Sequence, residues 1–352
     1  MAHRSEESLN GAVEECARIL STAVASCAVT SGLLDSLDHY QTLDDLMRRW
    51  SFHPEKARTV VTLLDLLEEQ GLLEHVEGPV KAYRRKDPGD LESRLHPLER
   101  DLRRPLLRGD LLEPWLPAAH AGAIWQAQRH FLGAELQFLR QAGRWLTFDK
   151  AFLDAWQTNL TNPLYEYGRI FAVQALAGRG RRFLDLASGT GIGAQRLAEW
   201  SAQECEIICV DKSEDFLAVS RQLLFPPTTR LTHVVQDLNH GLPPLAPQSI
   251  DGVLFIGAFH YIADKASCLR QIYQVLRPGG KLAIGHCFVR SGLPDEGVND
   301  YMFSIAKESS YILSLHSLQT LLSASGFVIL DELHRGSQYT VIVERPALVQ
   351  AP

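Results

Sequence analysis

The chain has 352 residues, of which 45 % are hydrophobic and 22 % are charged. This composition is typical of folded globular proteins and excludes a disordered or fibrous chain. The 35 Lys and Arg residues against 42 Asp and Glu residues give a formal charge of −7, which argues against a generally basic nucleic-acid-binding surface. The length predicts about two domains.

The cysteines form no CxxC pair and no regular framework, so we expect reduced, buried thiols and a cytoplasmic protein. No apolar stretch is long enough for a transmembrane helix, and the first ten residues lack the apolar core of a secretion signal. We therefore expect no membrane association. The six cysteines are Cys16, Cys27, Cys205, Cys209, Cys268 and Cys287.

The first 86 residues predict three helices followed by a hairpin. Residues 11–31 are Ala-rich and favour a helix. Thr42, followed three positions later by Asp45, is typical of a capped helix start. Residues 54–70 carry apolar side chains at helical spacing, and residues 72–85 alternate about a Gly-Pro turn. Three helices and a hairpin make a winged-helix pattern.

The next segment, from residue 87 to about 178, is mostly helix-compatible and rich in aromatic side chains. At this spacing aromatic residues more often belong to a core than to a ligand site, although the segment could also form part of an apolar pocket. Both interpretations remain open at this stage. The aromatic residues are Trp115, Trp125, Phe131, Phe138, Trp145, Phe148, Phe152 and Trp156.

After residue 182 the pattern becomes an alternation of short apolar runs and helix-length segments, which predicts a parallel sheet covered on both faces. The last two strands are separated by too few residues for a crossover helix, so we expect an antiparallel hairpin at the sheet edge. The fold class is therefore α/β, a Rossmann-like sheet with a reversed last strand. The apolar runs are 183–187, 206–211, 231–236, 252–259 and 281–288.

A glycine turn follows the first strand of this sheet. Asp185 ends the strand, and Gly189 and Gly191 lie in a turn that opens into a helix, where backbone N–H groups are free to bind a ligand. Asp211 ends the second strand, where an acid can accept hydrogen bonds from a ribose. The spacing through Ala194 also fits the dinucleotide fingerprint, so the turn alone does not identify the cofactor.

The residues after the following strands indicate which cofactor the glycine turn binds. Asp237 and Leu238 follow the third strand, where an acid and an apolar residue can bracket an adenine. His260 follows the fourth strand, and a Pro-Gly-Gly turn at residues 278–280 leads into the fifth. This ordered series resembles the class I S-adenosylmethionine-dependent methyltransferases over residues 165–345.

The resemblance extends upstream, because residues 57–85 look like the winged-helix dimerisation domain of the small-molecule O-methyltransferase family. It implies a dimerisation domain at 1–100, a helical linker contributing to the pocket at 101–165, and a cofactor domain at 166–352. It further implies a homodimer that methylates a small, mostly apolar acceptor, with no nucleic-acid partner.

The resemblance also assigns the cofactor residues. The glycines would hold the methionine end of S-adenosylmethionine, the acid after the second strand its ribose, and the pair after the third strand its adenine. Ala187 stands where the family usually has its first loop glycine, and one extra methyl group predicts little loss of binding. The expected cofactor residues are Asp185, Gly189, Gly191, Asp211, Asp237 and Leu238.

His260 falls at the position of the family's catalytic base, where a neutral imidazole could remove a phenol or enol proton. The family flanks this histidine with two glutamates, but Gly285 and His286 stand at the first position and Ile312 at the second. Three alternatives follow. His260 acts as a weaker base, the acceptor is acidic enough to need no base, or the methyl group goes to an activated carbon.

His260, His286 and His316 could be read as a metal site, but metal ligands must converge and usually include a carboxylate or thiolate. We therefore expect no metal and interpret these histidines as polar pocket residues. Residues 295–315 roof the substrate cavity in the family. The candidate substrate-pocket residues are His286, Tyr301, Met302, Phe303 and Tyr311.

Three other functions each agree with part of the sequence. A repurposed enzyme could keep fold and cofactor but run a pericyclic or decarboxylative step, because fold does not fix function. A winged-helix DNA-binding regulator has support only from the locally basic segment 81–108, while residues 54–70 are too apolar and acidic for a major groove. An NAD-linked oxidoreductase does not account for the Asp-Leu pair at 237–238 and the Pro-Gly-Gly turn.

Overall fold

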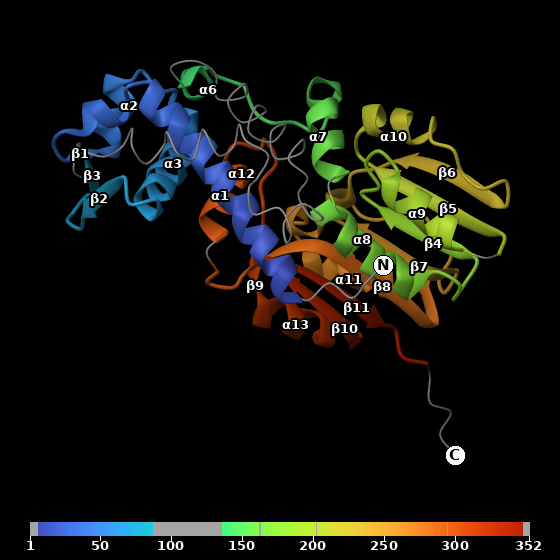
Figure 1. Cartoon of the computed structure of the whole chain (residues 1–352). Helices are drawn as coiled ribbons and strands as arrows, with labels where there is room; N and C mark the ends of the chain where they lie inside the picture. Colours follow the sequence, from blue (N-terminus) through green and yellow to red (C-terminus); the bar gives the residue numbers. More distant parts are fainter. Residues whose placement is uncertain (1–5, 87–135, 162, 202, 294, 348–352) are drawn as a thin grey trace. The chain divides into compact units, whose positions relative to one another are not determined.

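The computed structural model describes residues 6–86, 136–161, 163–201, 203–293 and 295–347. They form two compact units (Figure 1), each described by itself. The N-terminal unit contains residues 1–146, 162–164 and 294–307, and the sheet unit contains residues 147–161, 165–293 and 308–352. Much of the linker expected at 101–165, including Trp115, Trp125 and Phe131, lies outside the described residues. The expected domain limits therefore stay a prediction.

The N-terminal unit holds the predicted helices and hairpin. Thr42 begins a helix with a capping box, in which its side chain accepts from the Asp45 N–H and Asp45 accepts from the Thr42 N–H. The predicted hairpin is confirmed, and its two strands join a third in an antiparallel sheet of order β1-β3-β2. The elements are α1 Glu6–Thr30, η1 Leu34–Leu37, β1 Gln41–Thr42, α2 Leu43–Arg49, η2 Pro54–Lys56, α3 Ala57–Glu69, β2 Leu73–Val76, β3 Ala82–Arg85 and α6 Gln137–Arg140.

A helix from late in the sequence also belongs to the N-terminal unit. Helix α12, Glu296–Ser304, packs against α3 and α1. The Thr59 hydroxyl donates to the Ser304 carbonyl oxygen at 2.8 Å, and the Thr62 hydroxyl lies 2.8 Å from the Ser304 hydroxyl. Tyr301 is fully buried on this helix. The inner face of α12 is therefore part of the core of the N-terminal unit.

The sheet unit is built on the predicted strands. Their order is β10-β11-β8-β7-β4-β5-β6; the five central strands pair in parallel, and β10 and β11 form the expected antiparallel hairpin, with β10 at the edge. The strands are β4 Arg182–Leu186, β5 Cys205–Asp211, β6 Thr229–Val235, β7 Ile250–Ile256, β8 Leu276–Arg290, β9 Leu313–Ser314, which pairs with β8, β10 Val328–Arg335 and β11 Gln338–Glu344.

Helices cover both faces of this sheet, as the unbroken apolar strands require. Helices α11 and α13 pack on one face, and α8, α9 and α10 pack on the other. This confirms the predicted α/β class. The remaining elements are η5 Lys150–Phe152, α7 Leu153–Leu160, α8 Pro163–Leu176, α9 Ile192–Trp200, α10 Glu214–Ser220, η6 Leu238–His240, η7 Phe259–Tyr261, α11 Lys265–Val275 and α13 Leu315–Ala324.

The strand order reverses between β4 and β7. From β4 the chain runs outward through β5 and β6, and it then returns to place β7 on the other side of β4. In open α/β sheets, ligands bind at the carboxyl ends of the strands beside such a switch point. The loops after these strands are therefore where a cofactor site is expected.

Among the described helices, none is long and apolar enough to cross a membrane. The cysteines whose side chains are described are buried and form no disulfide with one another. They are Cys27, Cys205, Cys209, Cys268 and Cys287.

Candidate functional site

The glycine turn between β4 and α9 has the backbone that its sequence predicts. Gly189 and Gly191 both take positive φ, 55° and 83°. A Cβ atom on Gly191 would lie 2.2 Å from the Ser220 hydroxyl oxygen, so only glycine fits there. Ala187 also has a positive φ, 52°, a conformation that costs an L-residue roughly 1–2 kcal/mol. The alanine at the family's first glycine position is thus strained as well as slightly larger.

Asp185 offers an unused carboxylate oxygen beside this turn. Its side chain is buried, and among the described residues its Oδ2 atom has no hydrogen-bond partner. The Thr190 hydroxyl is also buried and also has no hydrogen-bond partner among the described residues. Burial, together with the nearby Asp211 carboxylate, raises the pKa of Asp185 to about 7. A buried carboxylate of this kind fits a cationic ligand that donates hydrogen bonds, which is what the methionine end of S-adenosylmethionine presents.

Asp211 holds the other side of the turn. Its two carboxylate oxygens accept from the Gly189 N–H and the Ser213 N–H, each at 2.8 Å. Burial raises its pKa, while these backbone N–H groups oppose that rise. Each carboxylate oxygen keeps a free lone pair, so Asp211 can still accept from ribose hydroxyls as expected.

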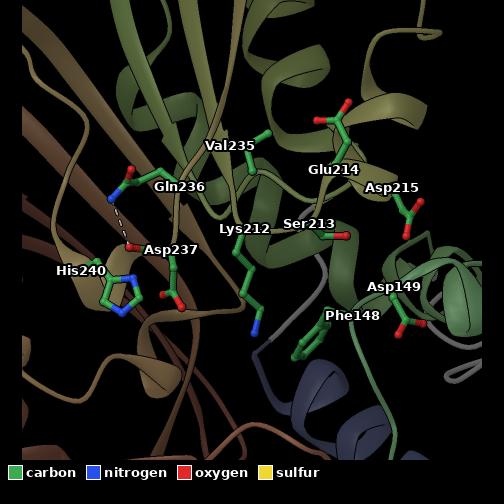
Figure 2. A pocket seen from close by; sticks show the side chains of 10 residues that line it. All are labelled: Phe148, Asp149, Lys212, Ser213, Glu214, Asp215, Val235, Gln236, Asp237 and His240. Carbon is green, nitrogen blue, oxygen red and sulfur yellow. Dashed lines mark hydrogen bonds between the residues drawn. The ribbon is translucent and has the colours of Figure 1, made fainter.

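An open pocket of about 620 Å³ lies at the carboxyl ends of β5 and β6. Asp237 lines this pocket, whereas Leu238 is buried in the core of the sheet unit. Their expected contacts with an adenine stay a prediction. Four of the pocket's lining residues carry a carboxylate and one is a lysine (Figure 2). Arg221 pairs with Glu214, and Lys212 pairs with Glu308. The lining residues are Phe148, Asp149, Lys212, Ser213, Glu214, Asp215, Val235, Gln236, Asp237 and His240.

Among these lining residues the sequence predicts only Asp237 as a site residue, and Phe148 and Lys212 are two of those that it misses. The Phe148 ring stacks on Trp156 at 4.8 Å and meets Tyr261 edge-on at 5.3 Å. The Lys212 Nζ atom lies 2.6 Å from the Glu308 carboxylate and 5.4 Å from the centre of the Phe148 ring. Lys212 directly follows Asp211, the residue expected to bind the ribose, and this position could have indicated that Lys212 lies at the site. For Phe148, the run of aromatic residues did not distinguish pocket from core.

His260 lies in η7, just after β7, and is buried. Its backbone carbonyl accepts from the Tyr311 N–H at 2.7 Å. The Lys265 ammonium donates to the carbonyl oxygens of Ile262 and Tyr311 at 2.7 and 2.6 Å, which fixes the segments on both sides of the histidine. Burial and then the charge of Lys265 lower the pKa of His260 to about 3. The imidazole is therefore neutral at physiological pH.

The expected substrate-pocket residues are not brought together in the pocket of Figure 2, and none of them lines it. Tyr301 and Phe303 are buried and Met302 is half-buried, all three in the N-terminal unit. Tyr311 is 45 % exposed in the sheet unit. His286 is buried within β8, where its ring stacks on Tyr165.

No three His, Cys, Asp or Glu side chains of the described residues come close enough to hold a metal ion. The His286 Nε2 atom lies 2.7 Å from the Tyr165 carbonyl oxygen. A ring nitrogen that faces a carbonyl carries a hydrogen and cannot bind a metal.

Residues 184–284 match the family model of a methyltransferase domain. An uncharacterized methyltransferase of Mycobacterium tuberculosis is 35 % identical over 109 residues, which are 31 % of this chain and 41 % of the relative. An O-methyltransferase of Penicillium expansum is 28 % identical over 163 residues, 46 % of this chain and 58 % of the relative. The chain thus spans about half the length of these curated relatives.

Among solved structures, the fold is similar to that of the DszA carbon methyltransferase, with a TM-score of 0.69 and 16 % identity. The likeness covers 99 % of this chain and 97 % of that one. The matched region contains the glycine turn and the strands on both sides of the switch point, so this part of the chain is the one that is similar to methyltransferases.

Proposed function

We propose that the chain transfers a methyl group from S-adenosylmethionine to a small, mostly apolar acceptor. The observation that carries this proposal is the buried Asp185 oxygen without a described partner, which lies beside a glycine turn inside the matched methyltransferase region. Gly189 and Gly191 leave their backbone open to the methionine end, Asp211 accepts from the ribose, and Asp237 faces the adenine. When bound, the cofactor supplies an electrophilic methyl group on its sulfonium.

The environment of His260 limits how much base catalysis the protein supplies. The ring is neutral, lies beside the Lys265 ammonium, and contacts the aromatic rings of Tyr261 and Phe288 at 4.3 and 5.2 Å. None of these neighbours is a carboxylate that would stabilise an imidazolium. The acceptor we propose is therefore an acidic phenol or enol. His260 takes its proton during the transfer, and orientation in line with the sulfonium supplies most of the rate.

Oxygen is the methylated atom in this proposal, in keeping with the O-methyltransferase relative. Carbon is the second candidate, because an acidic enol is nucleophilic at both atoms and the solved structure of similar fold is a carbon methyltransferase. A screen of phenols, enols and activated carbon acids with methyl-¹³C S-adenosylmethionine separates the two, since methoxy and C-methyl carbons have distinct chemical shifts. A product without label under turnover would exclude methyl transfer and favour a repurposed enzyme.

We further propose that the helices and hairpin of the N-terminal unit form a winged-helix domain that makes the protein a homodimer. The apolar face of α3, with Leu63, Leu64 and Leu67 buried, supports a packing role for this helix over a nucleic-acid-reading one. Light scattering coupled to size exclusion should give twice the mass of the chain. A monomer at micromolar concentration would overturn the dimer, and a salt-dependent shift of duplex DNA would favour a regulator instead.

A further inference from the structure

The strand β8 contains a break in its regular backbone at His286. Cys287 pairs with Tyr339 and Ile284 with Val341, so Gly285 and His286 together face the single residue Thr340. His286 takes a φ of 50°. A β-bulge of this kind turns a side chain in a new direction and is common beside active sites. A left-handed backbone at a residue other than glycine is uncommon and often marks a functional constraint.

The re-aimed imidazole has a single defined protonation state. Its Nε2 atom lies 2.7 Å from the Tyr165 carbonyl oxygen, so Nε2 carries the hydrogen and donates it. Its Nδ1 atom lies 2.7 Å from Nη2 of Arg335 and 3.1 Å from the Gln338 side-chain oxygen. Because Arg335 can only donate and lies against both atoms, Nδ1 accepts from it and carries no hydrogen. Arg335 is buried at the end of β10 and also donates to the Gln338 side chain. Burial and the charges of Arg335 and Arg169 lower the pKa of His286 well below its usual value.

Two residues of helix α8, Tyr165 and Gly168, lie against the His286 ring. The imidazole stacks on the Tyr165 ring with 3.8 Å between ring centres and 21° between planes. A Cβ atom on Gly168, one turn further along α8, would lie 2.7 Å from the His286 ring. Glycine inside a helix costs about 0.5–1 kcal/mol relative to alanine, so Gly168 accepts that cost and leaves space for the imidazole.

The stacked tyrosine reaches the switch point of the sheet. The Tyr165 hydroxyl lies against the backbone of Gly257, where a Cβ atom would be 1.8 Å from it. Gly257 directly follows β7, has a φ of 72°, and donates its N–H to the Gly285 carbonyl oxygen of the bulge at 2.8 Å. Gly257 lies three residues before His260. The bulge, Tyr165 and the loop that carries His260 are therefore one connected structure.

We propose that His286 and Arg335 are positioning residues, which hold the Tyr165 hydroxyl at the carboxyl end of β7, where the methyl group is transferred. This proposal rests on the proposed function for the location of the sulfonium between β4 and β7. It assigns His286 a different role from the substrate contact expected from the sequence. His286 acts through Tyr165, and Tyr165 forms the wall on the methyl side of the cofactor.

The first test compares the affinities for S-adenosylmethionine and S-adenosylhomocysteine by calorimetry, because these two ligands differ only in the methyl group and its charge. We expect His286→Leu and Tyr165→Phe to weaken S-adenosylmethionine about tenfold and to change S-adenosylhomocysteine less than about twofold. His286→Gln keeps a donor for Tyr165 and an acceptor for Arg335, so it should restore the wild-type ratio. His39→Leu, at an exposed position of the N-terminal unit, is the matched control.

Equal weakening of both ligands in His286→Leu, or a His286→Gln variant as damaged as His286→Leu, would overturn the proposal. A wild-type protein that binds neither ligand would instead contradict the proposed function. The second test does not depend on the cofactor. Imidazole ¹⁵N–¹H correlation spectra should show His286, assigned by its loss in His286→Gln, as the neutral Nε2–H form, and Arg335→Met should perturb it. A wild-type Nδ1–H form or a cation at neutral pH would also overturn the proposal.

Discussion

At the carboxyl edge of the sheet, the titratable side chains near β4, β5 and β6 differ in charge from those near β7 and β8. At the ends of β4 and β5, Asp185 and Asp211 are buried. Asp211 accepts from two backbone N–H groups, and Asp185 retains an oxygen with no described partner. After β7 and β8, the titratable groups are neutral imidazoles placed near Lys265 and Arg335. The carboxylates near β4 and β5 can bind a cationic ligand, whereas the histidines near β7 and β8 stay neutral. In the proposed function, the carboxylates that bind the cofactor and the histidine that takes the proton therefore lie on different strands.

The largest effect should come from His260 on the β7 side. We expect His260→Ala to lower kcat by about 10²-fold or more, with the Kd for S-adenosylmethionine unchanged, because the groups proposed to hold the cofactor, including Tyr165, stay in place. Turnover with the methyl-labelled cofactor and calorimetry measure the two quantities. His39→Ala, at an exposed position of the N-terminal unit, is the control. Unchanged turnover would leave orientation alone as the source of the rate.

The pH profile of kcat checks the same histidine independently. Because the pKa of His260 is lowered to about 3, the ring stays neutral across the physiological range. The profile should therefore show no break near the ordinary histidine pKa of about 6.5. A break there that disappears in His260→Ala would mean that the ring is more accessible to water than its burial indicates.

On the cofactor side, Asp211→Ala should weaken S-adenosylmethionine about 100-fold. It removes the charged acceptor proposed for the ribose hydroxyls, and one hydrogen bond to a charged group is worth about 1.5–3 kcal/mol. Isothermal calorimetry measures the loss. Asp45→Ala removes a comparable capping carboxylate in the N-terminal unit and should lower stability without changing cofactor affinity. Equal affinity in Asp211→Ala would remove Asp211 from the site.

Asp185 should make cofactor binding depend on pH. Its pKa is about 7 in the free protein, and a cationic ligand prefers the ionised form, so affinity should rise about tenfold between pH 6 and 8. Asp185→Asn should bind weakly with a flatter pH profile. Calorimetry at several pH values checks this, and a parallel rise in both proteins would assign the pH dependence to the ligand.

The raised pKa of Asp185 also predicts that the free energy of unfolding depends on pH. The folded pKa of about 7 exceeds the usual value of 3.8, so the stabilisation due to bound protons is complete below pH 4 and is lost as pH rises through 7. Without cofactor, Asp185→Asn should therefore gain stability over the wild type by about 4 kcal/mol across that range. Denaturant unfolding at pH 5 and 8 should detect about 2.6 kcal/mol of this change, and a constant difference would contradict a raised pKa.

The smallest effect concerns Ala187 in the glycine turn. Ala187→Gly should stabilise the protein by about 1 kcal/mol, because glycine adopts a φ of 52° without strain. Thermal unfolding measures the gain. Ala198→Gly, inside α9, is the matched control and should destabilise by a similar amount. A loss of stability in Ala187→Gly would show that the methyl group contributes more by packing than the strain costs.

Local chemistry in the sequence was enough for much of the fold. The capping box at Thr42, the Gly-Pro turn of the first hairpin and the short link between the last strands each depend on neighbouring residues, and each prediction is confirmed. The glycine turn also has its predicted course. Asp185, Asp211 and Asp237 follow strands whose positions are readable from apolar runs, which is why the sequence could place them at one edge.

The rest depends on contacts between distant segments. The left-handed backbone of His286 arises because one residue of β11, Thr340, faces two residues of β8, and no local pattern around His286 encodes that register. The pairing of Lys212 with Glu308 joins segments far apart in the chain. Helix α12 has an apolar face that fits a roof over a pocket as well as it fits the N-terminal core. The sequence could identify that face but not its partner.

The membership of α12 in the N-terminal unit has a consequence for how the gene can be divided. A shortened chain that begins near residue 147 would carry the whole sheet but leave Val298, Tyr301 and Phe303 without the core that buries them. Such a chain would expose an apolar helix and tend to aggregate. The N-terminal unit is encoded in separate pieces, so an exchange between relatives must move both the first segment and residues 294–307. Recombination at a single point would break the core of that unit.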